Sequence, residues 1–315
     1  MSVAAGSVTP VGWPEGRRFA FTVFDDPDGQ TLEAGREIYA LLADLGFRTT
    51  KGVWPLAADL PPGWGGSCED AAYREWCVRL QTDGFEIGYH NARQTTSPRE
   101  NTERALDRFF EVFGHYPVTM SNHYNCDEDI YWGEYRLTGI YRRVYNLATR
   151  GKYHAKYFGH VPEHPYFWGD LCKSRIRYVR NFVFRHVDTL AMCPGMPYHD
   201  PQRPFVNRWY ASSEGANVRS FTETVSERNQ DLLMERGGGC IMYAHFGHGF
   251  VDGGKLDRGF VALMTRLAGS EGWFVPVGTL LDYLESSKGP TTLSDDRRAD
   301  LERRWLWAKL RHGTS

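Results

Sequence analysis

The stretch from Phe21 to Gly29 reads FTVFDDPDG, and the rest of the chain is interpreted around it. Apolar and aromatic residues lead into the adjacent carboxylates Asp25 and Asp26, and Pro27 and Gly29 end the run at once. Side chains alternate between the two faces of a strand, but a strand that ends between the two aspartates lets the next turn bring both into one space. Two crowded carboxylates repel each other unless a cation or a proton lies between them. The stretch therefore indicates either a metal ligand beside a general base or an Asx turn that closes a strand.

Strand-like and helix-like segments alternate along most of the chain. After the opening strand, the apolar spacing predicts further strands over residues 47–54, 85–90, 117–121, 209–213, 240–244 and 273–276, with one or two more between 177 and 192. The same criterion predicts helices over residues 31–45, 69–82, 98–113, 132–144, 222–236, 255–268, 277–284 and 294–310. A capping box formed by Ser97 and Glu100, with Pro98 at the first helical position, predicts the start of the third helix. The alternation favours an α/β fold with a parallel sheet, which becomes a barrel if the sheet closes.

Composition limits the kinds of partner and the compartment. The 315 residues carry a net charge of −2, so no global field draws in a nucleic acid or an anionic membrane, and partners must be sought at local sites. No apolar run approaches the roughly 20 residues that span a bilayer, and the first residues lack the basic-then-apolar order of a secretion signal. We therefore expect a cytoplasmic protein whose six cysteines are reduced and mostly buried. Without a shift in composition, residues 1–290 are predicted to form one domain and residues 291–315 a helical extension.

Three histidines directly follow predicted strands: His90, His123 and His245. Because the carboxyl ends of parallel strands share one face, these side chains are expected to meet Asp25 and Asp26 there. Each histidine alone is more often a structural residue, but two imidazoles and one carboxylate with open positions form a catalytic site for a metal such as zinc. Such a metal activates water and polarises a carbonyl oxygen, while a nearby carboxylate and histidine move protons. The pattern predicts hydrolysis of an ester or an amide.

Several of these segments resemble motifs of the metal-dependent polysaccharide deacetylases (carbohydrate esterase family four, the NodB-homology fold). FTVFDD resembles their T-F-D-D motif, EIGYH their second motif, and IMYAH their terminal strand-plus-histidine motif, in the same order over about residues 19–285. The resemblance implies a distorted (β/α)7-type barrel of seven or eight units. It also implies that Asp25 is the general base, that Asp26 and His90 bind the metal, and that His245 is the general acid.

The chain departs from this family at two of its motifs. The second motif normally supplies another histidine four residues after the first, where this chain has Gln94, and the usual Arg-Pro motif is replaced by SNHYNCDED. We expect His123 to take the vacant position as the third metal ligand. The alternatives are Gln94, or no third ligand at all, in which case metal binding would be weak or absent.

Three further residues are candidates for contacts with substrate. Arg93 lies in the polar loop after His90, His248 lies in a glycine-flanked loop, and Trp132 belongs to the aromatic-rich section from Tyr124 to Trp168. The alternatives are that Arg93 is a solvated side chain, that His248 is an ordinary loop residue, and that Trp132 packs within its loop.

The predicted function is metal-dependent removal of an N- or O-acetyl group from a carbohydrate or a sugar-containing precursor. Its cofactor would be one divalent ion, zinc first, with nickel, cobalt or iron as alternatives. Two other readings remain: an inactive glycan-binding or scaffolding protein with the same fold, and a metal-dependent amidase that acts on a compound other than a sugar.

Overall fold

The barrel is closed by seven parallel strands. The computed structural model describes residues 11–61 and 64–313. Its barrel strands are β1 (Phe19–Asp25), β2 (Thr50–Val53), β3 (Glu86–Tyr89), β4 (Thr119–Met120), β5 (Tyr178–Phe184), β7 (Arg208–Ser213) and β8 (Gly239–Ala244). Pairing runs in this order, and β8 returns to β1, with every neighbouring pair parallel. The predicted α/β barrel of the (β/α)7 type is therefore confirmed.

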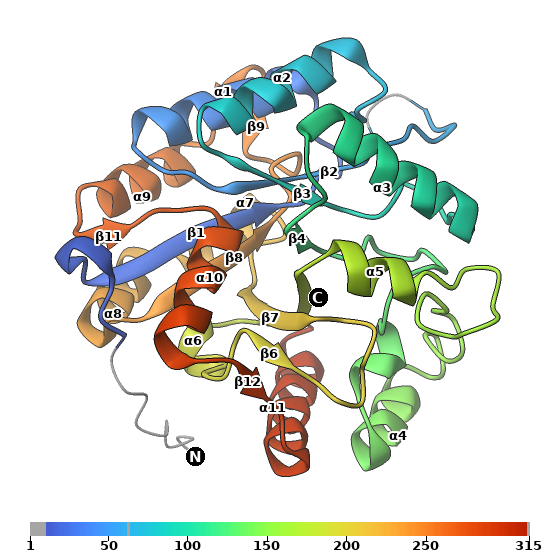
Figure 1. Cartoon of the computed structure of the whole chain (residues 1–315). Helices are drawn as coiled ribbons and strands as arrows, with labels where there is room; N and C mark the ends of the chain where they lie inside the picture. Colours follow the sequence, from blue (N-terminus) through green and yellow to red (C-terminus); the bar gives the residue numbers. More distant parts are fainter. Residues whose placement is uncertain (1–10, 62–63, 314–315) are drawn as a thin grey trace.

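Helices surround this barrel on all sides (Figure 1). They are α1 (Leu32–Asp44), α2 (Ala71–Thr82), α3 (Arg99–Phe113), α4 (Gly139–Ala148), α5 (Gly169–Arg175), α6 (Thr189–Met192), α7 (Val218–Thr224), α8 (Glu227–Arg236), α9 (Arg258–Ala268), α10 (Val277–Lys288) and α11 (Asp295–His312). The remaining short elements are the 3₁₀ turns Pro14–Gly16 and Gly133–Arg136 and the strands β6 (Tyr198–His199), β9 (Val251–Asp252), β10 (Lys255–Leu256), β11 (Gly272–Trp273) and β12 (Thr291–Thr292).

Strand β1 pairs with β2 on one side and with β8 on the other. All seven of its residues are buried, which explains why its sequence is nearly continuous in apolar and aromatic residues. It pairs with β8 over six residues, from Ala20 with Gly239 to Asp25 with Ala244. Across the interior, a Cβ atom at Gly88 of β3 would lie 2.8 Å from the ring of Phe24, so the close packing there requires a glycine.

Two predicted helices are divided in the structure. The segment predicted as one helix over 132–144 is a 3₁₀ turn followed by α4, because the backbone is extended at Leu137 and Thr138. The segment predicted over 222–236 is two helices, α7 and α8, separated at Val225 and Ser226. Both predictions missed a backbone break that the apolar spacing does not reveal.

The predicted capping box before α3 is also wrong. The helix begins at Arg99 after Pro98, and no side chain caps it. Ser97 instead donates its hydroxyl to the carbonyl oxygen of Thr95, and its amide donates to Glu128 at 3.0 Å. Ser97 is thus hydrogen-bonded to the loop that follows β4, and its side chain does not cap the helix.

The last helix, α11, packs back on the barrel. Its buried Trp305 lies 5.2 Å from the ring of Phe182 on β5, and Glu302 accepts two hydrogen bonds from Thr138 at the start of α4. The six cysteines are buried free thiols, as expected. Among residues 11–61 and 64–313 no helix is long and apolar enough to cross a bilayer. The division of the chain at residue 290 stays a prediction.

Candidate metal centre

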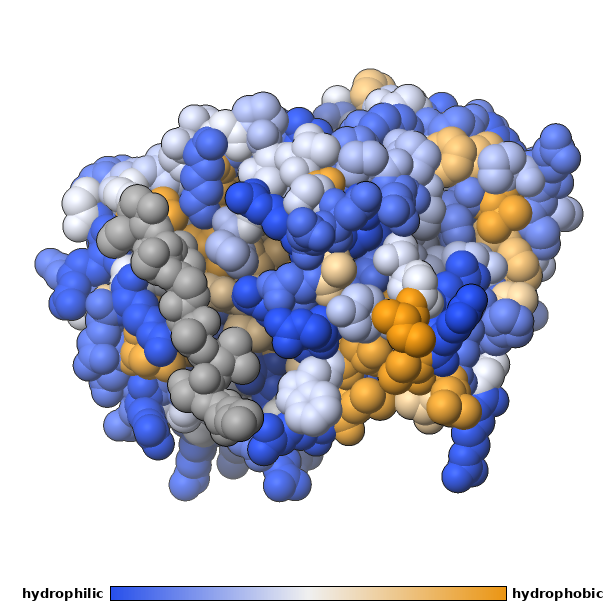
Figure 2. Space-filling model, turned by 90° about the horizontal axis from the view of Figure 1, so that it is seen from below, coloured by the Kyte–Doolittle hydropathy of each residue, from blue (hydrophilic) through white to orange (hydrophobic). Residues whose placement is uncertain are grey.

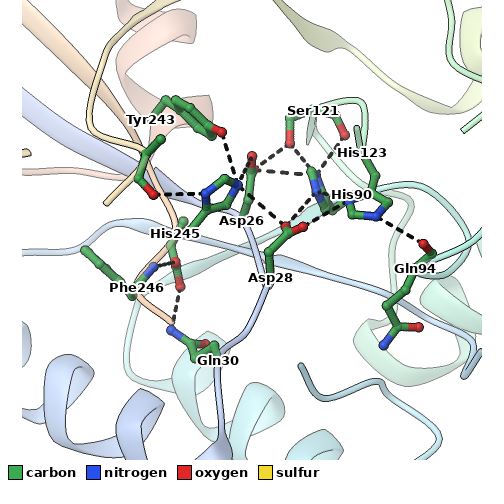
Figure 3. A network of polar contacts seen from close by, with 12 residues as sticks. Asp26, Asp28, Gln30, His90, Gln94, Ser121, His123, Tyr243, His245 and Phe246 are labelled. Atoms are coloured by element: carbon green, nitrogen blue, oxygen red, sulfur yellow. Dashed lines mark hydrogen bonds and ion pairs between the residues drawn. The ribbon is translucent and has the colours of Figure 1, made fainter. Parts of the chain in front are cut away.

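Three side chains at the carboxyl end of the barrel present ligand atoms to one point: Asp28, His90 and His123. His90 Nε2 lies 3.2 Å from His123 Nδ1 and 3.2 Å from Asp28 Oδ2, and His123 Nδ1 lies 3.2 Å from Asp28 Oδ1 (Figure 3). Ligands that hold zinc tetrahedrally at 2.0–2.1 Å lie about 3.3 Å from one another. The two imidazole nitrogens and the two oxygens of Asp28 therefore lie at separations that a metal-binding set would have.

Hydrogen bonds outside this set orient both imidazoles. His90 Nδ1 lies 3.1 Å from the carbonyl oxygen of Ser121, and His123 Nε2 lies 3.1 Å from the carbonyl oxygen of Gln94. A carbonyl oxygen only accepts, so the protons belong on these outer nitrogens, and the lone pairs of His90 Nε2 and His123 Nδ1 face each other and Asp28. Either a cation or an extra proton has to occupy the space between them.

The pKa values of His123 and Asp28 show how a proton could occupy this space in place of a cation. Burial lowers the pKa of His123, but its hydrogen bonds with Asp28 and Gln94 and the charges of Asp28 and Asp26 together raise it more, so the pKa lies above its usual value. Burial raises the pKa of Asp28, but its hydrogen bonds with His123 and His90 lower it well below its usual range. Asp28 is therefore an anion near neutral pH, which suits a metal ligand.

Asp28 reaches this position because β1 ends three residues earlier. The chain turns at once, with the amide of Gln30 donating to the carbonyl oxygen of Pro27 at 3.2 Å, and Gly29 has a φ of +65°. The turn directs Asp28 back over the strand end. His90 and His123 come from the ends of β3 and β4, as predicted.

Asp26 lies on the other side of the His90 ring. Its contact with that ring is 3.5 Å to Nδ1, the nitrogen already bonded to Ser121, and the role of Asp26 as a metal ligand stays a prediction. Arg180 on β5 binds it, with Nη2 2.6 Å from Oδ2 and Nη1 3.3 Å from Oδ1, and the hydroxyl of Ser121 donates to Oδ1 at 2.7 Å. Burial raises the pKa of Asp26, but Arg180, His90 and His245 together lower it more, and the pKa lies below its usual value.

Asp25 points into the barrel wall and is fully enclosed. Its Oδ1 accepts the amide hydrogen of Phe246 at 2.9 Å, and its Oδ2 lies 3.0 Å from Gln30 Nε2, 3.2 Å from Tyr39 Oη and 3.0 Å from Lys51 Nζ. Burial raises its pKa despite the nearby Lys51. With both oxygens occupied, Asp25 ties the turn that carries Asp28 to the loop that carries His245. Its assignment as general base stays a prediction.

His245 faces the same space from the end of β8. Its Nδ1 donates to the carbonyl oxygen of Ala216 at 3.0 Å, and its Nε2 accepts from the hydroxyl of Tyr243 at 3.1 Å. Nε2 also lies 3.8 Å from Asp26 Oδ2 and 3.7 Å from Asp28 Oδ2. Burial lowers the pKa of His245, so the ring is neutral in this arrangement. Its position fits the predicted role in proton transfer, which stays a prediction.

No protein-family model and no curated protein matches the chain. Solved structures similar to it include polysaccharide and peptidoglycan deacetylases. One is the peptidoglycan deacetylase PdaC from Bacillus subtilis, with 13% identity, a TM-score of 0.42 and coverage of 92% of this chain and 98% of that chain. Another is a probable polysaccharide deacetylase from Pseudomonas aeruginosa PAO1, with 13% identity, a TM-score of 0.42 and coverage of 98% and 96%.

A structure with a different described activity is similar as well. It is the GH57-type branching enzyme from Pyrococcus horikoshii, with 10% identity, a TM-score of 0.45 and coverage of 88% of this chain and 72% of that chain. These identities and TM-scores are too low to assign chemistry. The function of this chain has to be argued from its own site.

The other predicted residues lie at varying distances from this centre. The ring of exposed His248 is 4.9 Å from that of His245, which places it beside the site. Arg93 donates to the carbonyl oxygen of Thr96 at 3.1 Å, and the side chain of Gln94 donates to Gly65, so Gln94 contributes only its backbone oxygen to the centre. Trp132 stacks on the guanidinium of Arg136. The roles of Arg93, His248 and Trp132 in substrate binding stay predictions.

Four residues of the site were not identified from the sequence: Asp28, Ser121, Arg180 and Tyr243. Two of them had a visible signal. Asp28 is the third carboxylate of the opening stretch FTVFDDPDG, and Arg180 is a charged residue within YVRNFVF, a strand that is buried throughout. A charge inside a buried strand requires a partner, and here that partner is Asp26.

The aromatic-rich section beside the site is held by a buried carboxylate. Glu134 accepts hydrogen bonds from Arg142 Nε at 2.7 Å, Asn146 Nδ2 at 2.6 Å and the amide of Ala155 at 2.8 Å, and lies 3.0 Å from His154 Nδ1. These contacts join the 3₁₀ turn, α4 and the following loop. Loop packing, which the sequence left as the alternative to substrate contacts for this section, is therefore present in the structure.

Replacing Glu134 with glutamine is expected to destabilise the fold in a pH-dependent way. Burial opposes ionisation, but the hydrogen bonds led by that of Arg142 lower the pKa of Glu134 from 4.5 to about 2. Its stabilising effect is therefore complete above pH 4.5 and lost as the pH falls toward about 2. Urea unfolding should show a loss of about 2 kcal/mol at neutral pH that shrinks in acid, whereas Glu235→Gln on exposed α8 should change little. A loss that is constant with pH would contradict this account.

Proposed function

We propose that the chain is a metal-dependent hydrolase that removes an acetyl group, bound as an amide or an ester, from a carbohydrate or a sugar-containing precursor. The observation that carries this proposal is the triad of Asp28, His90 and His123: the two facing imidazole nitrogens lie 3.2 Å apart, each lies 3.2 Å from one oxygen of Asp28, and the outer imidazole nitrogens are already hydrogen-bonded. The sequence motifs shared with polysaccharide deacetylases support the acetylated sugar as substrate. A cytoplasmic precursor, rather than a finished polymer, is part of the proposal.

The donor set of two imidazoles and one carboxylate suits a borderline divalent ion, zinc first and nickel, cobalt or iron as alternatives. Bound there, such an ion would act as a Lewis acid and lower the pKa of water near it. Asp26 then accepts the proton of the attacking water, because Arg180 keeps its carboxylate ionised and fixed.

The chain also offers a route for this proton to the leaving group. His245 Nε2 lies 3.8 Å from Asp26 Oδ2 and carries no proton in the resting arrangement. A proton taken up by Asp26 can pass to Nε2, and from there to the departing nitrogen or oxygen of the sugar. Ala216 and Tyr243 hold the ring so that Nε2 faces this space.

Metal removal tests the proposal directly. The purified chain is expected to contain one equivalent of divalent metal and to release acetate from N- or O-acetylated sugars. Dialysis against a chelator should abolish acetate release, and added zinc or cobalt should restore it. Mass spectrometry measures the metal content, and an enzymatic assay measures the released acetate.

Two outcomes would favour the other readings. Metal binding with release of ammonia but no acetate would indicate an amidase acting on another compound. A chain with no affinity for added zinc, nickel, cobalt or iron would overturn the hydrolase and leave a glycan-binding or scaffolding protein.

A further inference from the structure

Large apolar side chains gather on the outer faces of α4 and α11, far from the metal centre in sequence. On α4 the side chains of Ile140, Val144 and Leu147 are 62%, 38% and 81% exposed. On α11 those of Trp307 and Leu310 are 65% and 50% exposed. These five residues are called the α4–α11 surface below.

Each helix presents its exposed apolar residues as one stripe, and the two helices contact each other. Ile140, Val144 and Leu147 recur at intervals of four and three residues, so they form one stripe of α4, and Trp307 and Leu310 form a stripe of α11. The helices contact each other through the rings of Tyr145 and Trp305, 5.9 Å apart. Figure 2, which views the molecule from below, shows hydrophobic residues gathered in one area of this side, bordered by hydrophilic ones.

The residues that border this surface carry positive charge. Arg143 is exposed on α4 and Arg150 is exposed two residues after that helix ends. Arg303 and Arg311 are exposed on α11. The sequence of α4 contains no acidic residue, and the acidic residue of α11 after Asp300 is Glu302, which is buried. Asp300, one turn earlier, is ion-paired with Arg303 and Arg304.

We propose that the α4–α11 surface docks on an anionic lipid bilayer. Protruding aliphatic side chains and a tryptophan suit the boundary between headgroups and acyl chains, while the surrounding arginines suit anionic headgroups. A second copy of this chain fits less well, because a symmetric contact would bring the arginines of both copies together. The net charge of −2 does not oppose the contact, since screening leaves only charges within about 10 Å effective.

Vesicle sedimentation of the full chain tests this proposal without reference to catalysis. We expect binding to phosphatidylcholine vesicles that contain phosphatidylglycerol, weak binding to pure phosphatidylcholine, and loss of binding at high salt. Joint replacement Leu147→Ser and Trp307→Ser should weaken binding by about tenfold or more. Arg143→Gln with Arg150→Gln should remove the preference for the anionic lipid.

The control is Phe110→Ser, which removes a side chain that is 47% exposed on α3, outside the α4–α11 surface. It should leave vesicle binding unchanged, and circular dichroism should show that all variants are folded. Equal binding to both kinds of vesicle, or binding that the four substitutions do not affect, would overturn the proposal. So would light scattering that shows a dimer dissociated by Leu147→Ser, because a second copy would then cover the surface.

Discussion

Asp28→Asn is expected to remove both metal binding and turnover. Asp28 supplies the single negative charge of the ligand triad, and an amide oxygen cannot replace it against two imidazoles that are already neutral donors. Affinity for zinc should fall by at least about a hundredfold, since even the loss of a residue outside the ligand set costs ten- to a hundredfold. Isothermal titration with zinc and metal content after dialysis measure the effect.

This variant separates the ligand set proposed from the geometry from the one predicted from the motifs. If Asp28 binds the metal, Asp28→Asn loses the metal and Asp26→Asn keeps it. The opposite pattern would restore Asp26 to the ligand set and contradict the triad. Asp59→Asn, at an exposed loop position, serves as the matched control and should keep both metal and activity.

The convergence of His90 and His123 at one end of the barrel could be predicted from the sequence, whereas the role of His123 as a metal ligand stays a prediction. The reasoning needed only the order of strands, because side chains that follow neighbouring parallel strands converge whatever the loops do. His90 and His123 follow β3 and β4, which pair directly through Tyr89 and Met120. The same reasoning placed His245 beside them.

The roles of the three carboxylates after β1 could not be read from the sequence. They depend on a turn that directs Asp28 over the barrel end and leaves Asp25 within the wall. They also depend on partners distant in the chain, such as Arg180, which is 154 residues from Asp26. Without those contacts, adjacent aspartates are equivalent in the sequence, so the roles that the motif resemblance implies for Asp25 and Asp26 stay predictions.

The section between β4 and β7 was the least predictable for a related reason. Its order comes from single buried polar residues such as Glu134 and Glu128, which bind amides and side chains from several loops. Such contacts have no periodicity. Apolar spacing therefore could not indicate where the 3₁₀ turn ends and α4 begins.

Asp26→Asn is expected to abolish turnover while leaving the metal bound. The asparagine retains the size of Asp26 but cannot take a proton from water. It also leaves the buried Arg180 without its carboxylate, so stability should fall as well and folding has to be checked on the same preparation. We expect kcat to fall by about a hundredfold to ten-thousandfold, which is the usual contribution of a general base. Metal content and zinc affinity measured on the same preparation should match those of the wild type.

Asp25→Asn provides the decisive comparison, because the motif resemblance makes Asp25 the base. It would leave Lys51 buried without its carboxylate, so stability should fall by about 3–5 kcal/mol. The double variant Asp25→Asn with Lys51→Met removes both charges and should recover part of that stability. If this folded double variant keeps kcat within about tenfold of the wild type, Asp25 holds the loops together and Asp26 moves the proton. If its kcat falls as far as that of Asp26→Asn while metal and fold persist, the base is Asp25, and the contacts of Arg180 serve structure alone.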